Sequence, residues 1–218
     1  MTLQSELEAF QSGWLERVGA DTAKLVRDDI DALRALASRA LKAGDTFPAM
    51  TLPRGDGETI DLASITARGP AIITFYRGGW CPYCNLELRA FQKLLPEIQA
   101  LGATLIAVSP ETPDHTVETA EKNGVAFTVL SDAKGELAKA LGIQFELAPA
   151  IKALYQKFGH DLAARNDDPR WALPMPATYV VGQGGRIAAA FVDPDYRRRM
   201  EPSEAVAALK TLSAHAAA

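Results

Sequence analysis

The only two cysteines of this 218-residue chain, Cys81 and Cys84, form a single C-x-x-C pair. A disulfide between residues this close closes too short a loop to stabilise a fold, because the stabilisation grows with loop length. The pair is also only half of a four-ligand zinc site, and the three histidines lie singly and far from it in sequence. The cysteine pattern therefore indicates redox chemistry in a reducing compartment and disfavours a structural bridge or a metal site.

The cysteine pair lies where a strand is predicted to turn into a helix. Residues 71–76 (AIITFY) form the short β-branched and aromatic run that is typical of a buried central strand. Residues 86–101 carry apolar side chains at helical spacing. The glycines at 78–79 allow the chain to turn between these elements, and Pro82 suits the first position of the helix.

Cys81 is thereby predicted to lie at the N-terminus of that helix, where unpaired amides and the helix dipole favour a thiolate. Cys84 follows one turn later, within reach of a disulfide. A thiolate of low pKa attacks its target, and a neighbouring thiol then resolves the product as an internal disulfide. With Trp80 directly before it, the pattern indicates a redox pair and disfavours two inert buried cysteines.

The chain from residue 44 onwards alternates strand and helix patterns, which predicts an α/β fold with a mixed central β-sheet flanked by helices. A turn signal at residues 54–57 separates two short strand patterns and predicts a hairpin. Further strands are expected at 103–108 and 127–130, followed by a second hairpin from 178–181 and 186–192. Further helices are expected near 115–123, 132–142, 149–160 and 202–214.

Residues 1–43 are predicted to be an N-terminal helical extension of the main domain, residues 44–218. Apolar residues recur at helical spacing after Asp21 or Thr22, either of which could cap a helix that runs to Lys42. We expect the extension to pack against the main domain. A role in oligomerisation, such as a homodimer, is the alternative.

Composition excludes several classes of function. The net charge of −4 argues against binding of nucleic acid, which requires a basic surface. No stretch approaches the roughly 18 apolar residues of a membrane-spanning helix. The first ten residues carry acids and no long apolar run, so no signal peptide is predicted and a cytoplasmic location is expected.

Two short motifs resemble the thioredoxin fold. Residues 80–84 (WCPYC) are similar to the active site of thioredoxin, with the dipeptide familiar from glutaredoxins. Residues 176–179 (PATY) resemble the cis-proline segment that faces the cysteines in thioredoxin-like proteins. The resemblance implies a cis bond between Met175 and Pro176, with Pro176 and Thr178 as supporting residues of the site. An ordinary trans proline before a strand is the alternative.

A longer part of the chain resembles the peroxiredoxin-like branch of the alkyl hydroperoxide reductase/thiol-specific antioxidant family. The matching stretches, between about residues 42 and 202, are GDTFPAMTLP, ITFYRGGWCPYCNLELRAFQ, LIAVSPETPD, FTVLSD, WALPMPATYVV and AFVDPDY. The resemblance implies a thioredoxin-like fold and a peroxidase that reduces hydrogen peroxide or an organic hydroperoxide through Cys81 and Cys84. It also implies recycling by a thioredoxin- or glutaredoxin-type donor, and no cofactor.

The chain departs from the peroxiredoxin pattern P-x-x-x-T-x-x-C. The peroxidatic cysteine of that pattern falls on Cys84, and the acid often seen three residues later falls on Glu87. Its proline, however, falls on Arg77, its threonine on Cys81, and the usual late arginine on Pro176. Arg77 is therefore a candidate to supply the lost positive charge. An arginine that faces solvent at the end of the strand is the alternative.

Three questions stay open at this stage. By analogy with thioredoxin, Cys81 is the attacking sulfur. By alignment with peroxiredoxins, Cys84 is the attacking sulfur and Cys81 is its resolving partner. The cysteine and proline motifs also fit a thiol–disulfide oxidoreductase that acts on protein disulfides, and the N-terminal extension fits a redox-sensing module. The basic run at 196–199 (YRRR) is predicted to be a solvated surface, with an anion site as the alternative.

Overall fold

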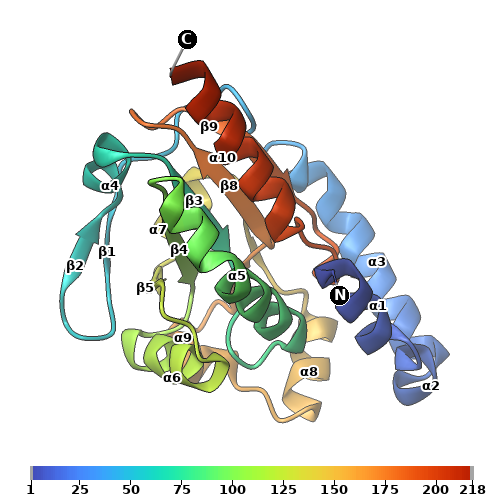
Figure 1. Cartoon of the computed structure of the whole chain (residues 1–218). Coiled ribbons are helices and arrows are strands. Elements are labelled where there is room, and N and C mark those ends of the chain that lie inside the picture. The colour runs from blue at the N-terminus through green and yellow to red at the C-terminus, as the bar shows by residue number, and fades with distance from the viewer. Residues whose placement is uncertain (1, 217–218) are drawn as a thin grey trace.

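The computed structural model describes residues 2–216 and shows a central sheet with helices on both faces (Figure 1). The sheet has the strand order β5-β4-β3-β8-β9. Its strands are β3 (Ala71–Phe75), β4 (Thr104–Ser109), β5 (Thr128–Ser131), β8 (Ala177–Val181) and β9 (Ile187–Val192). Strand β3 is parallel to β4 and β4 to β5, whereas β8 is antiparallel to both β3 and β9. This is the mixed sheet that the sequence predicts.

The two central strands, β3 and β8, are buried along their whole length. Their near-continuous apolar runs are typical of strands that are covered on both faces. The register pairs Thr74 with Thr178 and Phe75 with Ala177. The end of β3, where the cysteine turn begins, therefore lies beside the start of β8 and the proline that precedes it.

Successive residues of β3 point to opposite faces of the sheet, so each face has its own core. Ile72 packs with α5 (Pro82–Ala100) and α10 (Pro202–Ala216). Ile73 packs on the other face with α4 (Leu62–Arg68) and α7 (Glu136–Ala140). The helix α6 (Pro113–Asn123) lies between β4 and β5 in the chain and packs beside α5.

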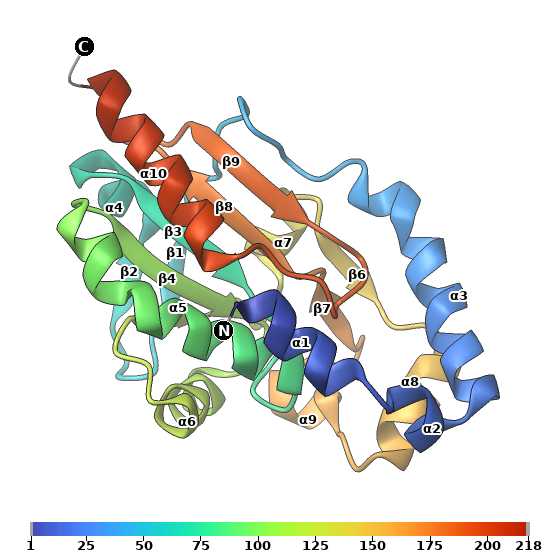
Figure 2. The ribbon, with the colours of Figure 1, turned by 45° about the vertical axis from the view of Figure 1, so that its right-hand side comes forward.

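The N-terminal segment consists of α1 (Leu3–Gln11), α2 (Trp14–Val18) and α3 (Ala20–Ala37), which lie along one side of the molecule near α8 (Pro149–Lys157) (Figure 2). Leu3 and Leu7 are buried in the core that contains α5. Val26 and Ile30 are buried in a smaller cluster with residues of α8. The helix α3 ends before the predicted Lys42, because the chain there turns back so that Leu41 N–H donates to Leu141 O at 3.0 Å. The segment thus packs against the rest of the chain.

Two small antiparallel pairs lie outside the main sheet. The first is the predicted hairpin of β1 (Thr51–Pro53) and β2 (Thr59–Asp61). The second pairs β6 (Gln144–Glu146) with β7 (Ala172–Pro174), and α9 (Leu162–Asn166) lies between them in the chain. The sequence does not predict this second pair, since strands of three residues are too short to show a periodicity. The β6–β7 pair brings the chain back to Ala177, where β8 begins.

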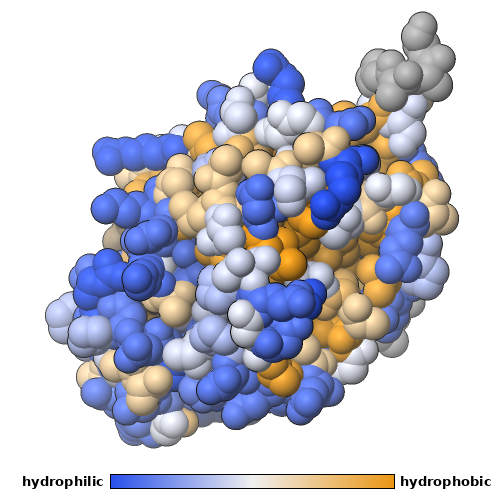
Figure 3. All heavy atoms as spheres, turned by 90° about the vertical axis from the view of Figure 1, so that its left-hand side faces the viewer, coloured by the Kyte–Doolittle hydropathy of each residue, from blue (hydrophilic) through white to orange (hydrophobic). Residues whose placement is uncertain are grey.

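The face that points away from α2 and α3 shows apolar residues gathered near its middle, with hydrophilic residues around them (Figure 3). Within residues 2–216, no helix combines the length and the apolar character that crossing a membrane requires.

Candidate active site

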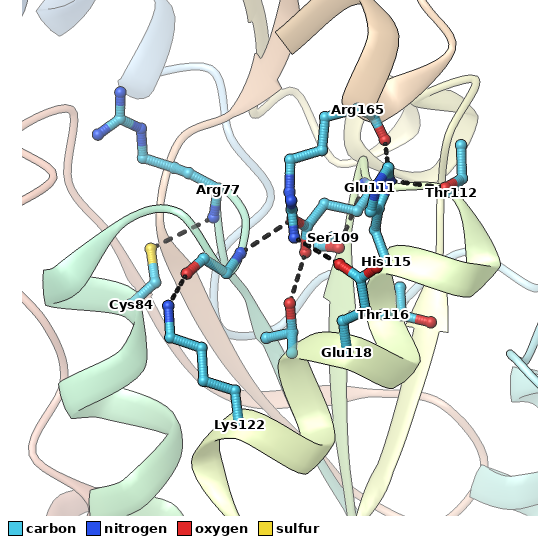
Figure 4. Close-up of polar contacts among 12 residues, drawn as sticks. Arg77, Cys84, Ser109, Glu111, Thr112, His115, Thr116, Glu118, Lys122 and Arg165 are labelled. Carbon is cyan, nitrogen blue, oxygen red and sulfur yellow. Dashed lines mark hydrogen bonds and ion pairs between the residues drawn. The ribbon is translucent and has the colours of Figure 1, made fainter. Parts of the chain in front are cut away.

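The two cysteines lie at the start of α5 as free thiols. Cys81 is the N-cap residue, Pro82 occupies the first turn with its ring exposed, and Cys84 follows within that turn. Both thiols are buried, with exposed fractions of 1% for Cys81 and 0% for Cys84. The backbone N–H of Arg77 donates to Cys84 Sγ at 3.4 Å (Figure 4). The pair therefore lies at a helix N-terminus, as predicted.

The turn before the cysteines has no space for larger residues. Gly78 has a φ of +143°, which disfavours other residues, and a Cβ on Gly79 would lie 2.1 Å from Thr119 Oγ1. Glu111 holds the turn in place, because its carboxylate accepts hydrogen bonds from Gly79 N–H at 3.0 Å and from Thr119 Oγ1 at 3.1 Å. Arg165 completes this network through an ion pair with Glu111 (Figure 4). The path of the turn is thus fixed by buried polar contacts.

Figure 4 shows that the side chain of Arg77 points away from that network. The side chain is buried in a cluster of aromatic rings. Its guanidinium carbon lies 4.9 Å from the ring centre of Trp80, 5.5 Å from that of Tyr155 and 4.2 Å from that of Tyr196. It donates a hydrogen bond to the Tyr155 hydroxyl, and its Nη1 is 4.0 Å from Cys81 Sγ. The solvent-facing alternative for Arg77 is wrong, because cation–π contacts and the cysteine keep it buried.

A second buried arginine, Arg199, contacts the other cysteine. Its Nε forms an ion pair with Glu87 Oε2 at 2.8 Å, and its Nη2 donates to Cys84 Sγ at 3.3 Å. The prediction of a solvated surface for this basic run is wrong at Arg199, although Arg198 is exposed. The chain after β9 folds back over the start of α5, and a separation of 115 residues leaves no local pattern that would predict this contact.

Thr178 reaches the site indirectly. Its hydroxyl lies 2.9 Å from Thr74 Oγ1, which in turn donates to Glu87 Oε1 at 3.3 Å. The two paired strands thus help to satisfy the buried carboxylate that also holds Arg199. Sequence reasoning places Thr178 and Glu87 near the cysteines, but it does not predict that they belong to one hydrogen-bonded chain.

Pro176 is buried and lines a narrow cleft together with Arg77 and Tyr196. The prediction of a cis bond before it is wrong, because residues 2–216 contain no cis peptide bond. The backbone N–H of Met175 donates to Ile143 O at 2.7 Å, so the chain passes from β7 into β8 without a tight turn. The proline is therefore an ordinary trans residue before a strand, which was the alternative.

The charges around the pair make the two thiols unequal. Burial alone raises the pKa of Cys81, but a hydrogen bond from Cys84 and the charges of Arg77 and Arg199 outweigh it and lower that pKa to about 6. Burial, together with the hydrogen bond and charge of Cys81, raises the pKa of Cys84 well above its ordinary value. Burial also raises the pKa of Glu87 to about 7, against the opposing charge of Arg199. Of the two thiols, Cys81 thus has the lower pKa, which favours the thiolate on Cys81.

We expect alkylation of Cys81 by iodoacetamide to rise with pH through about 6 and then to level off, because only the thiolate reacts. Mass spectrometry of peptides from the reduced protein would follow it. The pKa of Cys81 in the folded protein, about 6, is below its ordinary value of 9.0. This shift stabilises the folded state, and the stabilisation is fully present above pH 9.0 and is lost as pH falls through 6. Cys84→Ala removes the donor and should move the alkylation midpoint upward. An alkylation midpoint near pH 9.0 in the wild-type protein would contradict the lowered pKa of Cys81.

The model of the AhpC/TSA family matches residues 43–190 of this chain. The chain belongs to this family. A putative peroxiredoxin of Mycobacterium tuberculosis is 28% identical over 150 residues, which cover 69% of this chain and 84% of the relative. Peroxiredoxin bcp1 of Schizosaccharomyces pombe is 34% identical over 104 residues, which cover 48% of this chain and 53% of the relative. The crystal structure of peroxidoxin BcpB from Mycobacterium tuberculosis matches with a TM-score of 0.62 and 21% identity, over 79% of this chain and 98% of that one.

These matches confirm the predicted family and the thioredoxin-like fold, and they support thiol-dependent peroxidase as the enzyme class. The structure brings Arg77, Trp80 and Glu87 to the cysteines as predicted. Sequence reasoning missed Tyr155, and it singled out Tyr196 and Arg199 only as part of the basic run at 196–199, where a solvated surface was predicted and an anion site was the alternative. The family-like stretch AFVDPDY, which ends at Tyr196, is a second signal for that region.

Proposed function

We propose that this chain is a thiol-dependent peroxidase in which Cys81 attacks the peroxide and Cys84 resolves the product. The observation that carries the proposal is the position of the Cys81 sulfur, which lines a pocket and lies 4.0 Å from Nη1 of Arg77. A thiolate supplies the nucleophile, and a fixed positive charge stabilises the negative charge that develops on the departing oxygen. The AhpC/TSA family match supports the same chemistry.

In the first step the Cys81 thiolate attacks the terminal oxygen of the hydroperoxide. A sulfur–oxygen bond forms as the oxygen–oxygen bond breaks, and the departing oxygen takes a proton from solvent to become an alcohol or water. The sulfur is oxidised to a sulfenic acid as the peroxide is reduced. Attack by Cys84 would require a peroxide to reach a sulfur that is not part of the pocket wall and whose pKa is raised.

In the second step Cys84 attacks the sulfenic sulfur of Cys81. A disulfide forms, and the leaving hydroxide takes the proton of Cys84 to become water. The two cysteines belong to the same turn of α5, so this step needs no long-range movement. A thioredoxin- or glutaredoxin-type dithiol then reduces the disulfide by exchange and becomes oxidised itself.

The setting of the enzyme is part of the proposal. A dithiol that must be reduced in each cycle works in a reducing compartment, which supports a cytoplasmic location.

The buried residues of the N-terminal segment, such as Leu3 and Ile30, already pack within the chain. A homodimer through that segment would therefore use its remaining exposed surface, and the division into 1–43 and 44–218 marks a structural addition more than an independent unit.

Rapid mixing of the reduced protein with hydrogen peroxide tests the peroxidase. The ring of Trp80 lies 5.4 Å from that of Tyr155 beside the cysteines, so its fluorescence should report the oxidation. We expect oxidation far faster than that of free cysteine at the same pH, one disulfide per peroxide, and repeated turnover with a thioredoxin-type donor. Slow oxidation by peroxide with fast exchange against protein disulfides would assign the chain to the alternative thiol–disulfide oxidoreductase. A single oxidation without turnover would indicate a redox-sensing module.

A further inference from the structure

The pocket beside Cys81 is much larger than hydrogen peroxide requires. Its volume is about 210 Å³, whereas one molecule of liquid water occupies about 30 Å³. One part of its wall comes from the N-terminal segment through Phe10, Trp14 and Val26, and another part comes from α8 and the residue after it, through Tyr155 and Phe158. The pocket is thus built between two parts of the chain that lie far apart in sequence.

The walls are mainly aromatic, and two of their rings are left in contact with water. Phe10 has an exposed fraction of 40% and Phe158 one of 51%, although the transfer of a large apolar side chain out of water is favourable. Phe10 is held in position by an edge-on contact with Tyr83, with 5.1 Å between ring centres. Both rings belong to the lining of the pocket, so an apolar ligand bound there would cover them.

The charged residues that line the pocket are Arg17 and Arg77, and both make hydrogen bonds within the chain. Arg17 donates to the backbone oxygens of Ser12 at 3.2 Å and Phe10 at 3.1 Å, so its charge is engaged at the rim. Arg77 is already bonded to Tyr155 and directs Nη1 toward Cys81. Thr22 and His160 also belong to the lining, so the pocket combines mainly aromatic walls with a few polar groups, among them Arg77 beside the reactive sulfur.

The N-terminal wall is firmly held and lies outside the part of the chain that matches the family. The AhpC/TSA match begins at residue 43, whereas the wall comes from α1, α2 and α3 (Figure 2). Leu7 and Val26 anchor these helices in two core clusters. The backbone N–H groups of Leu3 and Gln4 also donate to the carboxylate of Glu201 at 3.2 Å and 2.5 Å. The wall is thus a structural addition of this chain to the family's catalytic frame.

We propose that the N-terminal helices and α8 form a specificity pocket that selects organic hydroperoxides with a bulky apolar substituent, above all an aryl group, over hydrogen peroxide. The inference rests on the proposed peroxidase function. The hydroperoxide group lies at Cys81 and Arg77, while the apolar substituent fills the space between Phe10 and Phe158 and covers both rings. Binding of the substituent then places the terminal oxygen in line for attack by the thiolate.

Single-turnover oxidation with cumene hydroperoxide and with hydrogen peroxide tests the pocket in the full-length reduced protein, with acid quenching and counting of remaining thiols. We expect the wild type to react at least about tenfold faster with cumene hydroperoxide. Phe10→Ala and Phe158→Ala should each lower that rate constant about five- to tenfold, because each removes one apolar wall, and leave the rate with hydrogen peroxide within about twofold. Phe158→Leu should give an intermediate value.

Val117→Ala is the matched control, since Val117 is a similarly exposed apolar residue on α6 that does not line this pocket. It should change neither rate. Equal effects of the phenylalanine variants on both peroxides, or no effect, would overturn the specificity pocket and leave the peroxidase intact. Loss confined to recycling by a thioredoxin-type donor would overturn it in favour of a docking surface for the reductant. Slow oxidation of the wild type by both peroxides would overturn the peroxidase itself, and the pocket with it.

Discussion

Cys81→Ser is expected to abolish oxidation by peroxide, with a loss on the order of 10³-fold or more, because serine offers no thiolate at neutral pH. Cys84→Ser is expected to keep the first step and to stop at the sulfenic acid of Cys81. The serine hydroxyl can still donate a hydrogen bond to Cys81, and Arg77 still lies 4.0 Å from its sulfur, so the low pKa is largely retained. Stopped-flow oxidation followed by dimedone trapping and mass spectrometry measures both results.

The opposite assignment makes a different prediction for the same pair of variants. If Cys84 attacks first, as the peroxiredoxin alignment implies, Cys81→Ser would accumulate a sulfenic acid on Cys84 at close to the wild-type rate. Cys84→Ala serves as a control, because alanine cannot donate to Cys81 and should slow the first step near pH 6 and 7. Excess peroxide should drive the trapped sulfenic acid of Cys84→Ser onward to sulfinic acid, whereas the wild-type pair resolves first.

Arg199→Met is expected to destabilise the fold by about 3 to 5 kcal/mol above pH 7, where the wild-type Glu87 is ionised, because the variant buries this carboxyl group without its charged partner. The side chains of this pair are exposed by only 1% and 0%. Urea denaturation followed by circular dichroism measures the difference. Arg198→Met is the matched control from the same basic run, since Arg198 is exposed and should change stability by no more than about 0.5 kcal/mol.

The pH dependence of this loss follows from the carboxyl group. The folded pKa of Glu87, about 7, lies above its ordinary value of 4.5, so its contribution to stability is greatest below pH 4.5 and is lost as pH rises through 7. Arg199 lowers this pKa, and its removal should raise it further. The defect of Arg199→Met should therefore be small below pH 4.5 and should grow as pH rises.

A double variant isolates the cause of that defect. Adding Glu87→Leu to Arg199→Met removes the unpaired carboxyl group, so it should recover part of the lost stability above pH 7. Equal stability of Arg199→Met and Arg198→Met, or no recovery in the double variant, would mean that the buried ion pair contributes little to folding.

Local pattern was sufficient to predict much of this protein. The apolar run of residues 71–76 forms β3, and the helical spacing after it forms α5, because each pattern can bury its side chains in only one kind of element. The same local rules place Cys81 at the helix N-terminus, where free amides stabilise a thiolate. The motifs around the cysteines also carried the family, which the match over residues 43–190 confirms.

Only the tertiary structure decided what surrounds the two sulfurs. Arg199 reaches Cys84 from 115 residues away, and Phe10 lines the same pocket as Tyr155 of α8. A single arginine in a basic run, or a phenylalanine on an amphipathic helix, carries no local sign of its partner. Such contacts form when distant segments pack together, so their identity depends on the whole core and not on spacing along the chain. The sequence alone thus determined the reactive pair, whereas the fold decided which of its sulfurs is charged and what lies in front of it.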